Sequence, residues 1–335
     1  MRQSTTVIIF VDARHIGGIE SHVIQLINYL KGAEVPVELW LWRRYPNSRF
    51  GEQLDLHGIL PMDLKGRFHL LLRRLWQQPN LVLHTHGYKA ALLGRFAARL
   101  CRTPCCSTHH AGESPTGRIG LYMALDRLSA RWATNFAVSQ PIAAQLPVPC
   151  DVIKNFTYLP SPPTRRFSPQ QPLQIGFVGR YESVKGFDRF NRLAQHDRAH
   201  YRWHSYGCGE TPAIAPVQDH GPQLNMGAIW PKLDLLIMPS RAEGLPLAAL
   251  EAMAAGVVVI AFDVGDLAEL ILPGTGWVLA EGDLAGISAA IDTYQRLSAN
   301  ERRAMSQCAR RCIEERWSAE QACQPLLAYY GNVNA

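Results

Sequence analysis

The chain has 335 residues, of which 47% are hydrophobic and 19% charged, and its formal net charge at pH 7 is +6. This length exceeds what one hydrophobic core normally serves, so we expect two soluble globular domains. The composition excludes a low-complexity chain, and no apolar run is long enough to predict a membrane span. The first apolar segment is too short for a signal peptide, and we therefore expect a cytoplasmic protein.

The cysteines and acidic residues do not follow the spacing of metal sites. Eight cysteines occur without a C-x-x-C pair, and the chain contains no Asp-x-Asp motif. We therefore expect buried thiols, with neither a disulfide framework nor a zinc site, and no bound metal or cofactor.

Hydrophobic runs alternate with amphipathic segments along the whole chain. This pattern predicts an α/β fold with parallel sheets covered by helices. The runs typical of strands lie at 6–11, 36–42, 80–86, 133–139, 173–179, 233–239 and 257–262. Residues 158–172 carry five prolines and no periodicity, which indicates a linker between a first domain at 1–157 and a second at 173–335. The last helix is a candidate to pack back on the first domain.

The first strand is followed by a glycine pair. Gly17 and Gly18 lie between this strand and a helix, where the backbone can approach a ligand closely. The G-x-G-x-x-G fingerprint of dinucleotide-binding proteins is absent, so this loop does not predict a nicotinamide or flavin cofactor.

A strongly basic interval follows in the first domain. No acidic residue occurs between Asp63 and Glu113. Within the interval, 67–76 predicts a helix that packs Phe68, Leu71, Leu72, Leu75 and Trp76 on one face and shows Arg67, Arg73, Arg74 and Leu70 on the other. This pattern favours an anionic partner, either an acceptor or a membrane surface; a plain solvated surface is the alternative.

Two histidines follow the short apolar run at 104–107. His109 and His110 are expected at the carboxyl edge of the first sheet, where ligands bind in α/β folds. The residues leave open which of the two histidines faces a ligand. Histidines in such loops also often lie at the surface or in the core without a catalytic role.

The first turn of the second domain carries two cations. Arg180 follows the strand ending at Gly179, and Lys185 precedes the next helix. Two cations on one turn at the carboxyl edge suit a diphosphate, although a solvated turn would have the same residues.

The segment 240–256 predicts a helix from Pro246 to Ala255 without a capping side chain. Leu245 offers no oxygen to the free N–H groups of the first turn, so a diphosphate could cap the helix. Glu243 and Glu251 would then reach hydroxyl groups on either side of that diphosphate, as in a nucleotide sugar. Two carboxylates paired within the protein are the alternative.

These motifs resemble the large retaining family 4 of GT-B glycosyltransferases, which have two Rossmann-like domains facing each other across a cleft. The resemblance rests on "GGIESHVIQL", "AVSQPIAAQL", "VIKNF", "GRYESVKG" and the two glutamates of 240–256, and it touches both halves of the chain in the same order.

The resemblance implies a role for each motif. Arg180 and Lys185 would hold the donor diphosphate, Glu243 the transferred sugar and Glu251 the ribose. The backbone at Gly244, Leu245 and Leu247 would meet the donor, while Gly17, Gly18 and His109 would approach from the first domain. The family transfers without a metal, and the donor's phosphate takes the acceptor proton.

The predicted activity is transfer of a sugar from a UDP- or GDP-linked donor to a cell-surface glycan. We expect an anionic acceptor such as a lipopolysaccharide core or glycolipid, contact with the inner face of the membrane, and no nucleic acid. A nucleotide-sugar epimerase or hydrolase of the same fold is one alternative. A non-catalytic partner subunit is another, but the four residues Arg180, Lys185, Glu243 and Glu251 are all intact.

Overall fold

The computed structural model describes residues 5–13, 17–46, 48–110, 118–157, 172–196 and 201–333. The chain forms two compact units. The first unit comprises Met1–Tyr158 and Ala319–Ala335, and the second comprises Leu159–Ser318. The predicted linker at 158–172 lies outside the described residues except for Pro172.

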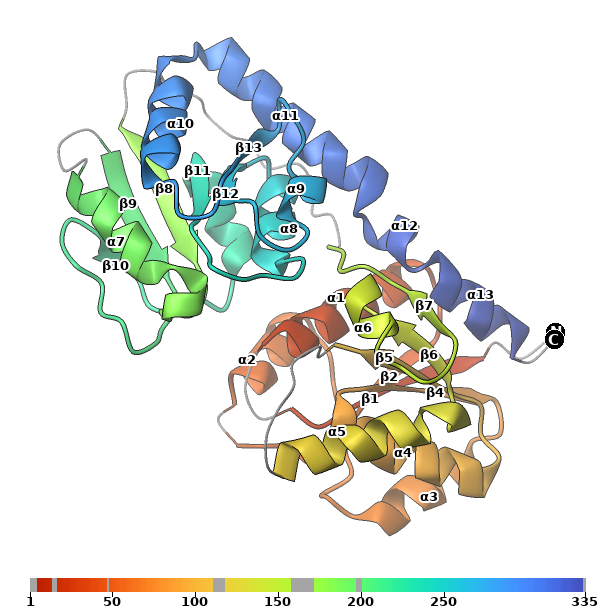
Figure 1. The fold of residues 1–335 in the computed structure, drawn as a ribbon. Coiled ribbons are helices and arrows are strands. Elements are labelled where there is room, and N and C mark those ends of the chain that lie inside the picture. Colours follow the sequence, from red (N-terminus) through yellow and green to blue (C-terminus); the bar gives the residue numbers. More distant parts are fainter. Residues whose placement is uncertain are drawn as a thin grey trace. The chain divides into compact units, whose positions relative to one another are not determined.

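The first unit alternates strands and helices (Figure 1). Its strands are β1 (Thr6–Val11), β2 (Val37–Leu41), β3 (Met62–Asp63), β4 (Leu81–His86), β5 (Cys105–His109), β6 (Thr134–Ala137) and β7 (Cys150–Val152). Its helices are α1 (Gly18–Gly32), α2 (Arg49–Leu56), α3 (Phe68–Gln77), α4 (Tyr88–Cys101), α5 (Arg118–Ser129), α6 (Gln140–Ala143), α12 (Ala319–Ala322) and α13 (Gln324–Asn332), with a 3-10 turn at Ala130–Trp132.

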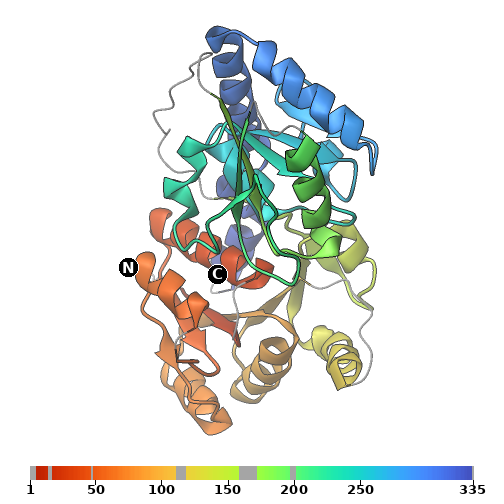
Figure 2. The ribbon, with the colours of Figure 1, turned by 90° about the vertical axis from the view of Figure 1, so that its left-hand side faces the viewer.

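The strands of this unit form one parallel sheet in the order β3-β2-β1-β4-β5-β6-β7. Helices α1, α2, α12 and α13 bury their apolar side chains on one face of the sheet. Helices α3 and α4 pack on the other face, and α5 lies beside α4 (Figures 1 and 2). The C-terminal helices therefore complete the core of the first unit, with Leu326 and Tyr330 buried there.

The second unit repeats the same plan. Its strands are β8 (Leu173–Val178), β9 (Tyr201–Tyr206), β10 (Gln218–Asp219), β11 (Leu235–Met238), β12 (Val258–Phe262) and β13 (Gly276–Leu279). Its helices are α7 (Phe187–His196), α8 (Leu247–Ala254), α9 (Leu267–Leu270), α10 (Leu284–Arg296) and α11 (Ala299–Arg316), with 3-10 turns at Ser183–Lys185, Met226–Ala228 and Trp230–Lys232.

Its parallel sheet has the order β10-β9-β8-β11-β12-β13. Helices α8, α9 and α11 cover one face, and α7 and α10 cover the other. Both sheets therefore have their first strand next to their fourth, the Rossmann arrangement, and the predicted α/β fold class is confirmed. In such a sheet the connections leave these two strands toward opposite faces and open a crevice at their carboxyl ends.

Two expectations about burial are wrong. Trp76 on α3 was expected to pack against its domain, but it is 86% exposed, whereas Leu70 packs against the core in its place. Trp76 lies in the last turn of the helix, one residue after the buried Leu75. Of the cysteines, all free thiols, Cys208 and Cys308 are exposed, so burial does not explain every thiol.

Candidate functional site

Two loops of the second unit meet at the crevice between its first and fourth strands. Residues 179–186 follow β8 and residues 239–246 follow β11, and these two strands are paired in parallel. The structure thus brings together two segments that lie about sixty residues apart, at the edge where α/β proteins bind ligands.

A cation and a carboxylate are paired at this edge. The Lys185 ammonium lies 2.6 Å from Glu243 Oε2, and the Ser240 hydroxyl lies 2.8 Å from Glu243 Oε1. The Glu243 side chain is 4% exposed, whereas the Lys185 side chain is 28% exposed. Both carboxylate oxygens are therefore held in place, while the ammonium keeps donors free for a second partner.

Backbone contacts hold the pair in register. Gly186 has φ +72°, and a side chain there would overlap the carbonyl oxygen of Pro239. The Arg241 N–H donates to the Val184 carbonyl at 2.8 Å. Only glycine permits this close approach, which brings Lys185 beside Glu243.

Helix α8 begins beside this pair without a capping side chain. It runs from Leu247 to Ala254, so the helix starts one residue later than predicted, and Pro246 takes the N-cap position. Proline has no side-chain oxygen, and no side chain caps the helix. The N-terminus of α8 therefore presents backbone N–H groups and the positive end of the helix dipole next to Glu243.

The remaining predicted donor residues differ in their surroundings. Gly244 is exposed, Leu245 is buried and Leu247 is partly buried. Glu251 is partly buried on α8. Arg180 points into solvent with its side chain 66% exposed and lies 3.0 Å from Glu182. The structure thus joins Lys185 to Glu243, whereas Arg180 pairs with its own loop.

In the first unit, His109 lies within a buried polar network. Its Nδ1 lies 3.3 Å from Asp126 Oδ2, and its Nε2 lies 3.0 Å from Asn135 Oδ1 and 3.1 Å from Arg95 Nη2. Arg95 is fully buried; its guanidinium also bonds Asp126 and the Ser107 hydroxyl, at 2.9 and 2.8 Å. Both ring nitrogens of His109 therefore already have protein partners.

His110 points to the other side of the sheet. Its Nε2 lies 3.0 Å from His86 Nδ1, and its ring lies near that of His22, on the helix that follows Gly17 and Gly18. Neither His22 nor His86 belongs to a motif that the sequence predicts as a site. The segment "HTHG", at the carboxyl end of a predicted strand, was a signal that could have identified His86.

A second ion pair lies at the crevice of the first unit. Lys89, at the start of α4, places its ammonium 2.5 Å from Asp12 Oδ2, just beyond β1. The Tyr45 hydroxyl donates to the other oxygen of Asp12 at 3.2 Å. Sequence reasoning missed this pair because the residues are 77 positions apart and fit no motif.

Family models match both units of the chain. The model described as glycosyl transferases group 1 matches residues 172–296, and the model described as Glycosyltransferase Family 4 matches residues 16–151. Together they span more than half of the chain. The chain belongs to glycosyltransferase family 4.

Curated relatives of this chain align over parts of their length. The lipopolysaccharide core biosynthesis mannosyltransferase LpsB of Rhizobium meliloti (strain 1021) is 33% identical over 33% of this chain and 32% of its own. The 2-deoxystreptamine N-acetyl-D-glucosaminyltransferase of Streptomyces fradiae is 27% identical over 65% of this chain. The chain spans 63% of the length of that Streptomyces relative.

Solved structures share the GT-B fold over nearly the whole chain. Anabaena HepE in complex with UDP-glucose matches with a TM-score of 0.78 at 16% identity, covering 98% of this chain and 100% of that one. The lipopolysaccharide outer core galactosyltransferase WaaB matches with a TM-score of 0.64, also at 16% identity and with the same coverage. Among the described residues of the family 4 chain, no helix combines the length and apolar character needed to cross a membrane.

Proposed function

We propose that this protein transfers a sugar from a UDP- or GDP-linked donor to a cell-surface glycan, a lipopolysaccharide core or related polysaccharide. The observation that carries the proposal is the Lys185–Glu243 pair beside the uncapped start of α8. A cation and a helix N-terminus suit a diphosphate, and a fixed carboxylate suits sugar hydroxyls. The names of two curated relatives, both lipopolysaccharide core mannosyltransferases, support the acceptor class.

Each part of the second-unit site has a role in this proposal. Lys185, Arg180 and the backbone N–H groups of Gly244, Leu245 and Leu247 bind the diphosphate. Glu243 accepts hydrogen bonds from hydroxyl groups of the transferred sugar, because its carboxylate is already oriented by Ser240. Glu251 binds the ribose. In the first unit, the backbone at Gly17 and Gly18 contacts the donor.

The same groups account for transfer with retention and without a divalent cation. Charge develops on the diphosphate as the sugar leaves, and prearranged cations stabilise that charge. A phosphate oxygen of the donor takes the acceptor proton on the same face of the sugar from which the diphosphate departs. Lys185 and Arg180 supply the positive charge that Mg²⁺ would otherwise provide.

Two variants separate sugar recognition from nucleotide recognition. Glu243→Ala should abolish transfer but leave binding of the nucleoside diphosphate nearly unchanged, because the partners of Glu243 are on the sugar. Glu251→Ala should weaken nucleotide binding itself. Calorimetric titration with UDP and GDP, together with transfer assays, measures both effects, and Glu210→Ala at an exposed position is the control. Normal binding and turnover in both variants would contradict the assignment.

Metal independence is tested in buffer cleared of divalent cations. Transfer should proceed in that buffer, and addition of Mg²⁺ or Mn²⁺ should leave its rate unchanged. Strict dependence on either ion would contradict the proposed role of the two cations. Rapid donor hydrolysis without acceptor would instead favour a hydrolase.

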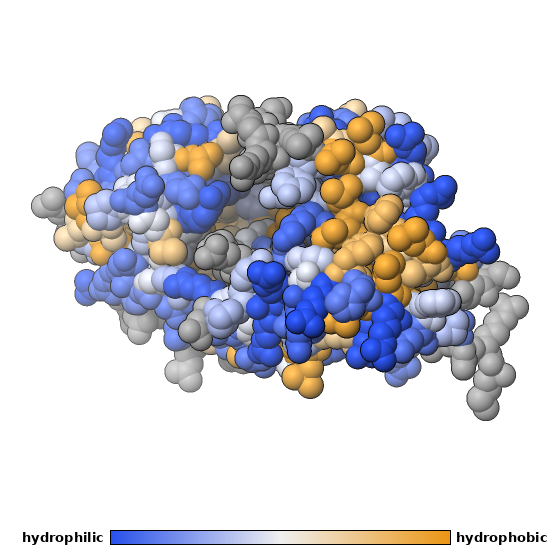
Figure 3. All heavy atoms as spheres, turned by 90° about the horizontal axis from the view of Figure 1, so that it is seen from below, coloured by the Kyte–Doolittle hydropathy of each residue, from blue (hydrophilic) through white to orange (hydrophobic). Residues whose placement is uncertain are grey.

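We further propose that the first unit contacts an anionic membrane surface through α3, α4 and α5. Exposed apolar side chains gather there, and we call them the aromatic face: Trp76, Phe96, Leu100, Tyr122, Leu125, Leu128 and Trp132. Figure 3 views this side of the unit and shows an apolar area bordered by hydrophilic residues.

The charges around the aromatic face fit a negatively charged surface. Exposed arginines lie on the same helices or at their ends, at positions 67, 73, 74, 99, 102 and 131. The acidic residue of α5, Asp126, is buried against Arg95 and leaves this positive charge uncompensated. Arginine with tryptophan and leucine is the composition of surfaces that bind lipid interfaces. Such a contact would place a membrane-bound acceptor beside the enzyme.

A further inference from the structure

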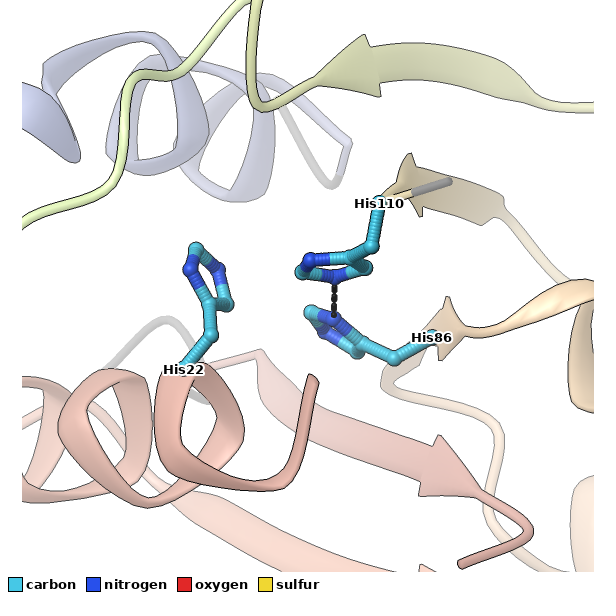
Figure 4. A group of neighbouring side chains, drawn as sticks. All are labelled: His22, His86 and His110. Carbon is cyan, nitrogen blue, oxygen red and sulfur yellow. Dashed lines mark hydrogen bonds between the residues drawn. The ribbon is translucent and has the colours of Figure 1, made fainter. Parts of the chain in front are cut away.

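Three histidines from separate segments of the first unit converge on one point. They are His22 on α1, His86 at the end of β4 and His110 just after β5 (Figure 4). One nitrogen from each ring lies within 4.8 Å of the others, and the His86–His110 pair is already at 3.0 Å. Figure 4 shows the ring of His22 facing this pair across a short gap.

The cluster contains buried nitrogens that lack well-formed hydrogen bonds. Within the described residues, this applies to both ring nitrogens of His22 and to His86 Nε2. His22 is 1% exposed and His86 is fully buried. A buried polar atom without a partner costs free energy, and structures rarely retain several at one place without a reason.

A neighbouring histidine shows that burial alone does not produce this arrangement. His84, also fully buried, bonds the Tyr330 hydroxyl through Nδ1 at 2.6 Å and the Thr108 hydroxyl through Nε2 at 2.7 Å. Its two nitrogens are therefore used within the protein. The three converging rings keep nitrogens available for a further ligand.

The three rings are in the form that binds metals. Burial lowers the pKa of His22 to about 4, although the nearby Asn155 opposes the shift. Burial also lowers the pKa of His86 and His110 well below its usual range, and the other histidines add to this effect. All three imidazoles are neutral at pH 7, and neutral imidazole carries the lone pair that a metal needs.

We propose that His22, His86 and His110 bind a divalent transition-metal ion, with Zn²⁺ as the best fit. Three imidazole nitrogens without a carboxylate suit Zn²⁺ and disfavour Mg²⁺ or Ca²⁺, which prefer oxygen ligands. Tetrahedral zinc with bonds of about 2.05 Å places its nitrogen ligands roughly 3.3 Å apart. The His86–His110 distance of 3.0 Å is close to this value, and all three ligand nitrogens lie within 4.8 Å of one another.

The bound metal would link the first helix to the ends of β4 and β5. Helix α1 begins at Gly18, so the link would fix the glycine loop relative to the sheet. Three protein ligands leave a fourth position for water or for an oxygen of a bound molecule. All three histidines belong to the first unit, whereas the Lys185–Glu243 pair belongs to the second.

The experiment measures metal binding by the whole 335-residue chain directly. Protein stripped with a chelator is titrated with Co²⁺, whose visible absorption reports tetrahedral nitrogen ligands, and Zn²⁺ is then added to displace it. We expect one equivalent per chain and a higher Tm with metal. His22→Gln, His86→Gln and His110→Gln should each weaken binding at least tenfold. Even the loss of a residue that only orients a metal ligand weakens binding about tenfold or more.

A matched control comes from the second unit. His204 and His220 also place ring nitrogens 3.0 Å apart, but without a third histidine beside them among the described residues. His220→Gln should keep full Co²⁺ affinity and stoichiometry. If His22→Gln fails to fold, His110→Gln at the partly exposed end of the cluster still tests the site. Two results would overturn the proposal. One is the absence of a Co²⁺ signal in the wild-type protein, and the other is a signal that is lost in His220→Gln but kept in the other three variants.

Discussion

The two units share a topology but use it for different chemistry. Each sheet places its first strand beside its fourth, and each has polar residues at the carboxyl ends of these strands. In the second unit these residues are a partly exposed lysine and a fixed glutamate. In the first unit, buried histidines and an arginine lie nearby, and an aromatic, basic face lies on the outer helices. The topology thus determines where polar groups gather, whereas the side chains determine what they can bind.

The largest expected difference between the units concerns how their ion pairs support stability. Asp126→Ala leaves the fully buried Arg95 without its carboxylate, which should cost about 3–5 kcal/mol of unfolding free energy. Asp188→Ala removes an exposed partner of Arg241 in the second unit and should cost less than about 1 kcal/mol. Denaturant unfolding measures both, and equal losses would remove this contrast between the units.

The second prediction concerns Lys185 and Glu243 as a coupled pair. Lys185→Ala should cost about 2–4 kcal/mol of transition-state stabilisation, measured through kcat/KM, whereas Glu243→Ala should abolish transfer. Lys185→Ala should also reduce stability, because it leaves a carboxylate that is only 4% exposed without its cation, whereas Glu243→Ala leaves a partly solvated ammonium. In a double-mutant cycle on the free energy of unfolding, the two losses of stability should not add. Arg180→Ala is expected to reduce kcat/KM within the same range without affecting stability.

Additive losses in the double variant would show that Lys185 and Glu243 act independently. Lys232→Ala serves as the control for the removal of positive charge, because Lys232 precedes β11 and the loop 239–246 follows the other end of this strand.

The third prediction tests the glycine contact that positions the pair. Gly186→Ala forces a side chain against the Pro239 carbonyl, so Lys185 must shift, and misplacement by about 1 Å can cost roughly 100-fold in rate. Gly221 has a similar positive φ but open space around it, so Gly221→Ala should show backbone strain only. Steady-state kinetics and Tm for both variants separate displacement from strain. Equal kinetics in the two variants would rule out the positioning role.

The smallest expected effect concerns the aromatic face of the first unit. Replacing Arg67, Arg73 and Arg74 by Gln should weaken binding to anionic liposomes about tenfold and raise the acceptor KM, and salt should weaken wild-type binding in the same way. Trp76→Ser should weaken binding to the same vesicles through lost apolar contact. Replacing Arg296, Arg303 and Arg311 of the second unit by Gln is the charge-matched control. Equal wild-type binding to neutral and anionic vesicles would identify an ordinary solvated surface.

The strong local patterns of the sequence predicted most of the fold. All seven strands expected from apolar runs are present, because a strand buried on both faces is apolar throughout and is easily recognised. The edge strands β3, β7 and β10 were not predicted, because with two or three residues each they are too short to show a periodic hydrophobic pattern. Strand β9 was missed because Arg202, His204 and Ser205 interrupt its aromatic side chains, so it does not form a continuous apolar run.

The candidate site was predictable to the extent that its residues lie on recognisable turns. The turn at 179–186 and the uncapped helix α8 follow from residue types and spacing, and both lie at one sheet edge. The pairing of Lys185 with Glu243 did not follow, because it depends on contact between two loops. The same holds for Asp12 and Lys89 in the first unit.

The sequence by itself determined the alternation of strands and helices, the position of the loops at their ends and the residue types those loops carry. The tertiary structure alone decided which side chains meet. His109 ends β5 and points into the Arg95 network, whereas His110, one residue later, points the other way toward His22 and His86. Successive side chains point to opposite faces of a sheet, so a shift of one position along the strand gives a side chain an entirely different set of neighbours. Those neighbours come from distant segments, and local patterns cannot specify them.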